Sequence, residues 1–122
     1  MVARTPVRRL QGHELCPIVE SIRKMGNEWR LVVTRYLLEH PMRFTEILKE
    51  ANIDSKTLTR VLKYLQDEKI VTRKVISTQP FAVQYQLTPK GRELQPVIES
   101  LKGWGEKWVI PELLQQVNTK RR

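Results

Sequence analysis

The spacing of apolar residues changes once along the chain, near residue 70, and this change constrains the fold more than any other feature. Up to Glu68 the apolar residues recur every three or four positions, the spacing of one buried helix face. Residues 70–76 are instead rich in β-branched side chains, and residues 83–87 alternate between apolar and polar. We therefore predict a mainly α-helical chain with one small β-hairpin, whose long loop covers residues 77–82.

Helical spacing and capping residues place the helices. They are predicted from Pro17 to a stop at Gly26, over 28–39, over 44–51, from 56 to about 68 with Ser55 as N-cap, and from Pro89 through Trp108 with a bend near Pro96 and an end or frayed tail at Pro111. A short helix, a turn at residues 52–54 and an amphipathic helix form a helix-turn-helix, and a hairpin directly after it is a wing. The predicted fold is a winged helix-turn-helix.

The charge of the chain narrows the classes of partner. Its 122 residues, enough for one domain, carry 22 Lys and Arg against 13 Asp and Glu, a formal net charge of +9. This excess favours a polyanionic partner, most often nucleic acid. We expect no membrane association, because no apolar run approaches the roughly 20 residues of a membrane helix. The N-terminus does not resemble a secretory signal, and a single cysteine suits a reducing compartment, so a cytoplasmic location is expected.

The helix over residues 56–68 has two chemically different faces. Leu58, Val61, Leu62 and Leu65 share one face, while Lys56, Arg60 and Lys63 point the opposite way, with Thr57 and Thr59 on the flanks. Such a helix suits the DNA major groove, although an ordinary solvated face is the simpler alternative. The DNA-binding candidates are Ser55, Lys56, Thr57, Thr59, Arg60 and Lys63 on this helix, and Arg73 and Lys74 on the hairpin. The two hairpin cations face opposite ways, and their alternative role is to keep an edge strand soluble.

Apolar residues of the last predicted helix form a short heptad seam. They are Leu94, Val97, Leu101, Trp104 and Trp108, spaced 3, 4, 3 and 4. Such a seam predicts a homodimer interface; packing against the chain's own domain is a compatible alternative. The expected division of the chain is a basic flexible arm (1–15), a winged helix-turn-helix domain with dimerisation helices (16–110) and a basic C-terminal tail (111–122).

Several ordered motifs resemble a known family. They are Cys16-Pro17-Ile18, Gly26-x-x-Trp29, Arg43-Phe44-Thr45-Glu46-Ile47, Ser55-x-x-Leu58-Thr59, Val83-x-Tyr85-x-Leu87-Thr88-x-x-Gly91 and Trp104-Gly105. Over about residues 16–105 the chain resembles the HxlR-type winged helix-turn-helix transcription regulators. The resemblance implies a cytoplasmic homodimer on pseudo-palindromic promoter DNA, with N- and C-terminal helices at the dimer interface. Some members of that family sense oxidants, electrophiles or small molecules, so an effector of this kind is a further expectation.

Cys16 is the one candidate for redox chemistry. It precedes Pro17 at a helix start, where a thiol pKa can fall, and the family resemblance places a sensing thiol here in some members. The alternative, a small buried apolar residue, is favoured because no cation is evidently beside it. The histidines, His13 and His40, have no metal-ligand spacing with Cys16, and the glycines form no phosphate loop. We expect no enzyme activity, no metal and no cofactor.

Three functions fit these observations. The leading hypothesis is a sequence-specific, homodimeric DNA-binding transcription regulator, with the helix over 56–63 in the major groove and the 70–87 hairpin as wing. The alternatives are an architectural DNA-binding protein of low specificity, and a winged helix that binds proteins and no longer binds DNA. Polar variety on the helix favours the regulator, because Ser55, Thr57 and Thr59 beside Arg60 suit base reading.

Overall fold

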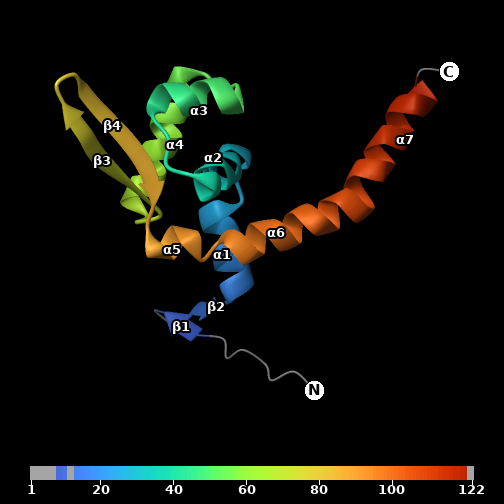
Figure 1. Cartoon of the computed structure of the whole chain (residues 1–122). Coiled ribbons are helices and arrows are strands. Elements are labelled where there is room, and N and C mark those ends of the chain that lie inside the picture. Colours follow the sequence, from blue (N-terminus) through green and yellow to red (C-terminus); the bar gives the residue numbers. More distant parts are fainter. Residues whose placement is uncertain (1–7, 11–12, 121–122) are drawn as a thin grey trace.

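The computed structural model describes residues 8–10 and 13–120 of the chain. Its elements are β1 (Arg8–Leu10), β2 (His13–Leu15), α1 (Pro17–Met25), α2 (Glu28–Glu39), α3 (Phe44–Ala51), α4 (Ser55–Asp67), β3 (Val71–Thr78), β4 (Phe81–Leu87), α5 (Pro89–Arg92), α6 (Gln95–Trp104), the π-helical turn η1 (Gly105–Val109) and α7 (Ile110–Lys120). In Figure 1 the helices α2, α3 and α4 form the body, and the β3–β4 hairpin and the α6–α7 arm leave it on opposite sides. This order confirms the predicted winged helix-turn-helix.

One hydrophobic core lies beneath α4. The apolar face of this helix is buried, with Leu58 and Leu65 fully covered. The core joins it to the other helices and to the base of the hairpin through Met25, Val33, Leu37, Met42, Ile47, Ile53, Ile70, Val71 and Leu87. Because the buried stripe fixes the rotation of α4, the opposite face of this helix must meet solvent.

The turn between α3 and α4 depends on two short polar residues. Asn52 ends α3 in the left-handed region, at φ 51°, where asparagine is tolerated better than most side chains. Asp54 then caps α4, and its Oδ1 accepts a hydrogen bond of 2.8 Å from the backbone N–H of Thr57. The predicted N-cap, Ser55, is therefore wrong by one residue, because the aspartate carboxylate reaches the free N–H groups first.

The hairpin is longer and its loop tighter than predicted. Strand β3 pairs antiparallel with β4 from Val71↔Leu87 to Thr78↔Phe81, with an irregularity between Val75 and Ser77. Only Gln79 and Pro80 connect the strands, so the expected long loop over residues 77–82 is incorrect. Hydrogen bonds between Met42 and Tyr85, of 3.0 and 2.7 Å, tie β4 to the segment before α3. This bridge holds the base of the hairpin against the helix-turn-helix.

The C-terminal region is divided by proline, though not where expected. Pro96 lies in the first turn of α6, and the helix is interrupted before it, at Glu93 and Leu94. The predicted single bent helix is therefore wrong. Pro111 does not end the helix either, since α7 continues to Lys120. The wider turn η1 ends at Val109, two residues before Pro111. A proline lacks its N–H and its ring presses on the preceding turn, and a π-helical turn accommodates both.

Two further points concern the termini. Residues 8–10 and 13–15 pair as an antiparallel ribbon, with Arg8 opposite Leu15, so this part of the predicted flexible arm has regular structure. Strand pairing does not require apolar periodicity, which is why the sequence missed it. The rest of the arm and the last two residues of the basic tail lie outside the described residues, and the three-part division remains a prediction.

No helix in the described ranges is long and apolar enough to cross a membrane.

Candidate nucleic-acid interface

The outward face of α4 gathers the predicted helix cations. Lys56, Arg60 and Lys63 are all exposed, as are Ser55 and Thr59. They stand opposite the buried leucines, so the helix is anchored on one side and offers positive charge on the other. Arginine and lysine on such a face can donate hydrogen bonds to guanine O6 and N7 or to phosphates.

The threonine hydroxyls of α4 already donate within the helix. Thr57 Oγ1 donates to Asp54 Oδ2 at 2.7 Å, and Thr59 Oγ1 donates to the Ser55 carbonyl at 2.7 Å. The same Thr57 hydroxyl, together with its backbone N–H, lowers the pKa of Asp54 by stabilising the carboxylate. With their hydrogens engaged in this way, the two threonine oxygens are left as hydrogen-bond acceptors.

The fold places Arg30, which the sequence analysis missed, next to α4. Arg30, from the first turn of α2, stacks on the ring of Tyr64 with 3.5 Å between its guanidinium carbon and the ring centroid. A shallow recess at the start of α2 joins Arg30 to Thr57 and Arg60. In the sequence Arg30 is thirty residues from Arg60 with no motif linking them, so only tertiary packing reveals that the two side chains line one recess.

The hairpin keeps its two candidate cations apart. Arg73 pairs with Tyr85 and Lys74 with Gln84 in the β3–β4 register, and both cations are exposed. Directly paired residues share one face of a two-stranded sheet, and neighbours on one strand lie on opposite faces. Since Tyr85 packs against the core, Arg73 is on the face turned toward the helices and Lys74 is on the other.

The predicted dimer seam is largely exposed. Val97, Leu101, Trp104 and Trp108 each leave more than half of their surface open, from 52 to 59%. Leu94 differs from them, because it is half-buried and packs against the core of its own domain. The apolar surface also reaches beyond the predicted residues, to Ile18, Val19 and Ile22 of α1 and to Ile110, Leu113, Leu114 and Val117 of α7. We call these exposed residues of α1, α6, η1 and α7 the apolar face.

Cys16 lies directly before α1, in the N-cap position, and is half-buried. Its carbonyl accepts the first backbone hydrogen bond of that helix, 2.9 Å from the Glu20 nitrogen. Among the described residues, no group of three or more His, Cys, Asp or Glu side chains could hold a metal ion.

Comparison with known proteins places these features in a family. A model of the HxlR-like helix-turn-helix matches residues 24–113. The regulator YodB of Bacillus subtilis is 34% identical over 102 residues, covering 82% of this chain and 91% of that protein, and its reduced form superposes with a TM-score of 0.70 over 80% of this chain and 97% of YodB.

Two further relatives give the same result. A Synechocystis helix-turn-helix regulator, sll1512, is 34% identical over 102 residues, covering 83% of this chain and 75% of that protein. The oxidised redox regulator HypR has a TM-score of 0.70 at 31% identity, over 75% of this chain and 96% of HypR. The family model covers most of the winged domain, and the relatives cover at least three quarters of the chain. This chain therefore belongs to the HxlR-like helix-turn-helix family of transcriptional regulators.

Proposed function

We propose that the protein regulates transcription as a cytoplasmic homodimer that binds operator DNA, with α4 in the major groove and the β3–β4 hairpin as wing. The observation that carries this proposal is α4 itself. Its leucine face is fixed in the core while Lys56, Arg60 and Lys63 stand free on the opposite face. The other proposed contacts are Ser55, Thr57 and Thr59 on the helix and Arg73 and Lys74 on the wing.

The apolar face supports the homodimer. Exposed tryptophans and leucines on adjoining helices are unfavourable in water, and a two-fold partner would cover the same surface on both copies. Val97, Leu101, Trp104 and Trp108 are the proposed centre of the interface. Leu94, which packs on its own domain, would brace the start of α6. A two-fold axis here would present two α4 helices to successive major grooves, about 34 Å apart.

The proposed effector is named by its chemical class, an oxidant or a small molecule. YodB is known in a quinone-bound form and HypR in oxidised and reduced forms. In this chain the corresponding candidate is the half-buried Cys16 thiol at the start of α1. Oxidation or small-molecule binding at this place would act on a helix that carries part of the apolar face.

The test of specific binding begins with a duplex selected by the full-length protein from random DNA. Arg60→Ala should weaken binding to this duplex by about 1–3 kcal/mol and relax the preference at one base pair in each half-site. Arg92→Ala is the matched control, because Arg92 is an exposed arginine on α5 and lies outside the proposed contacts. Equal losses in both variants, on all sequences, would show that Arg60 contributes only charge.

Competition separates the regulator from an architectural protein. The selected duplex and bulk genomic DNA compete for the protein at physiological salt. A regulator should prefer its site by roughly a thousandfold or more, whereas a ratio near one would favour an architectural role.

A further inference from the structure

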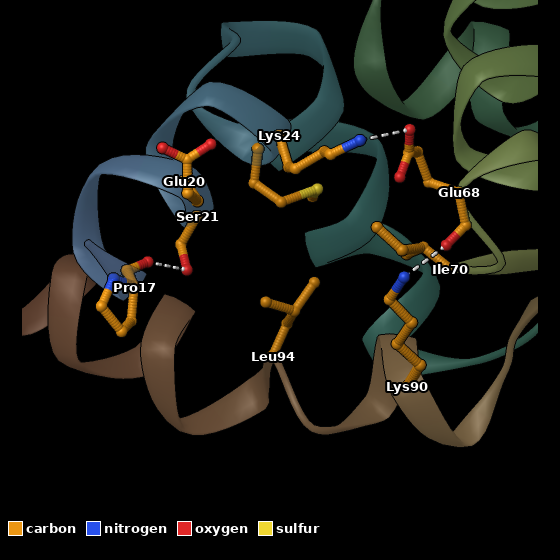
Figure 2. A pocket seen from close by; sticks show the side chains of 9 residues that line it. Pro17, Glu20, Ser21, Lys24, Glu68, Ile70, Lys90 and Leu94 are labelled. Carbon is orange, nitrogen blue, oxygen red and sulfur yellow. Dashed lines mark hydrogen bonds and ion pairs between the residues drawn. The ribbon is translucent and has the colours of Figure 1, made fainter. Parts of the chain in front are cut away.

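Helix α1 is held to its own domain by few apolar contacts. Its one buried residue is Met25, at its C-terminal end, while Ile18, Val19 and Ile22 face outward as part of the apolar face. A hollow of about 380 Å³, open to solvent, lies between α1, Ile70 and Leu94 (Figure 2) and is also lined by Met25. Close packing fixes the relative position of helices, and here it is incomplete.

Polar contacts of Lys24 span the gap between α1 and α4. The Lys24 carbonyl accepts hydrogen bonds from the Tyr64 hydroxyl at 2.8 Å and from Arg30 Nη1 at 3.1 Å. Its ammonium group binds Glu68 Oε1 at 3.0 Å, as Figure 2 shows. Tyr64 is on α4 and Glu68 is its C-cap residue. Lys24 therefore joins the last turn of α1 to the last turn of α4.

Two attachment points on α4 restrain how α1 is oriented relative to it. Tyr64 and Glu68 are four residues apart, slightly more than one helical turn or about 6 Å along α4. Two bonds at that separation restrain both the distance between the helices and their relative rotation. The Arg30 guanidinium stacked on the Tyr64 ring holds one point, and Lys90 Nζ, donating to the Glu68 carbonyl at 2.7 Å, holds the other.

The ion pair alone would be a weak restraint. The Lys24 side chain is 61% exposed and Glu68 is 24% exposed, so solvent screens their attraction. The hydrogen bond from Lys24 to Glu68, followed by the Coulomb attraction between them, still raises the pKa of Lys24. Together with the hydrogen bond from Tyr64 to the Lys24 carbonyl, the pair forms one connected cluster.

We propose that Lys24, Tyr64 and Glu68 are positioning residues that set the geometry between the dimerisation helix α1 and the recognition helix α4. This inference rests on the proposed function, in which α1 meets the partner and α4 meets DNA. In the dimer the two α4 helices are connected through the two α1 helices at the interface. A shift at the junction between α1 and α4 in one protomer is therefore repeated in the other by symmetry. The cluster would thereby fix the spacing of operator half-sites that the dimer accepts.

The test measures affinity as a function of half-site spacing. Full-length protein is titrated into the selected duplex and into versions with the half-sites moved together or apart in single base-pair steps; a duplex with one half-site is measured alongside. Lys24→Glu breaks the ion pair, and Lys24→Glu with Glu68→Lys restores it in reverse. Arg23→Glu is the matched control, since it reverses the neighbouring charge, whose partner Glu20 is on α1 itself. Tyr64→Phe removes the other attachment without a change in charge.

Spacing selectivity is the decisive readout. At the preferred spacing Lys24→Glu should bind about three- to tenfold more weakly than Arg23→Glu, because each lost contact biases the geometry by a factor of a few. Its loss at neighbouring spacings and on the single half-site should be no greater than the control's, and the reversed pair should restore the wild-type profile. Tyr64→Phe, like Lys24→Glu, should reduce the difference in affinity between the preferred half-site spacing and its neighbours.

Two results would overturn the positioning role. The first is a spacing profile for Lys24→Glu and Tyr64→Phe that keeps the wild-type shape. The second is an equal loss on the single half-site, which would mean that the cluster only supports α4 within its own domain. Failure of the proposed function itself looks different, because the wild-type protein would then select no duplex with two half-sites.

Discussion

Replacement of Leu101 tests whether the apolar face holds a dimer together. Leu101 lies in the middle of α6 and leaves 52% of its surface exposed in the protomer. It takes no part in the buried core, so its replacement should leave the fold of the single domain intact. Any effect should therefore fall on association between copies.

The size of the effect follows from the area still open. Complete burial of a leucine contributes about 1.5–3 kcal/mol, so covering the open half contributes about 1 kcal/mol per protomer. A two-fold interface contains two copies, and Leu101→Ala should weaken the dimer by about 2 kcal/mol, roughly thirtyfold in its dissociation constant. Leu101→Asp adds the desolvation of two carboxylates, a cost of several kcal/mol that should leave monomers at about 10 μM.

Sedimentation velocity over a concentration series measures this directly. Thermal unfolding of the same samples checks that the domain still folds. Gln115→Asp provides the control, because it places the same carboxylate on the polar side of α7, away from the leucine stripe of that helix. A folded Leu101→Asp protein that still sediments as a dimer would exclude α6 from the interface, and a monomeric wild type at tens of micromolar would exclude the dimer.

Three other predictions concern binding and stability. Affinity for the selected duplex should fall by about three to five decades between roughly 50 and 200 mM salt if a dimer neutralises about 6–10 phosphates, and a flat salt response would contradict this footprint. Ile47→Ala should destabilise the domain by about 2–5 kcal/mol in denaturant unfolding, since Ile47 is fully buried, whereas exposed Lys49→Ala should change it by less than about 0.5 kcal/mol. Asp54 has a lowered pKa, so its stabilising effect is complete above the ordinary value of 3.8 and is lost as the pH falls through the folded value. Acid unfolding of Asp54→Asn, which retains a good capping side chain, should therefore lack this part of the pH dependence.

The order of the elements could be predicted from the sequence because it follows from local periodicity. The spacing of Leu58, Val61, Leu62 and Leu65 specifies both a helix and its buried side, and the opposite placement of Lys56, Arg60 and Lys63 follows from the same 100° rotation. The change to β-branched residues from Ile70 onward, and then to alternating residues over 83–87, likewise places the hairpin next to that helix. These features depend on neighbours within a few residues, and the sequence alone determined them.

Boundaries were less well predicted, because several residue types compete for one role. Asp54 and Ser55 are both good caps, and only the backbone path decides which side chain reaches Thr57. Pro111 reads as a helix end, yet the wide turn at Gly105–Val109 lets the helix continue. Both of these errors lie at the end of a helix whose existence was predicted correctly.

Contacts between distant segments were decided by tertiary structure alone. The Lys24 carbonyl meets the Tyr64 hydroxyl across 40 residues, and its ammonium meets Glu68 across 44. The inward packing of Leu94, within a seam whose other members are exposed, has the same origin. A local sequence fixes which face of a helix is apolar, but the angle at which two helices meet depends on the packing of all the elements between them.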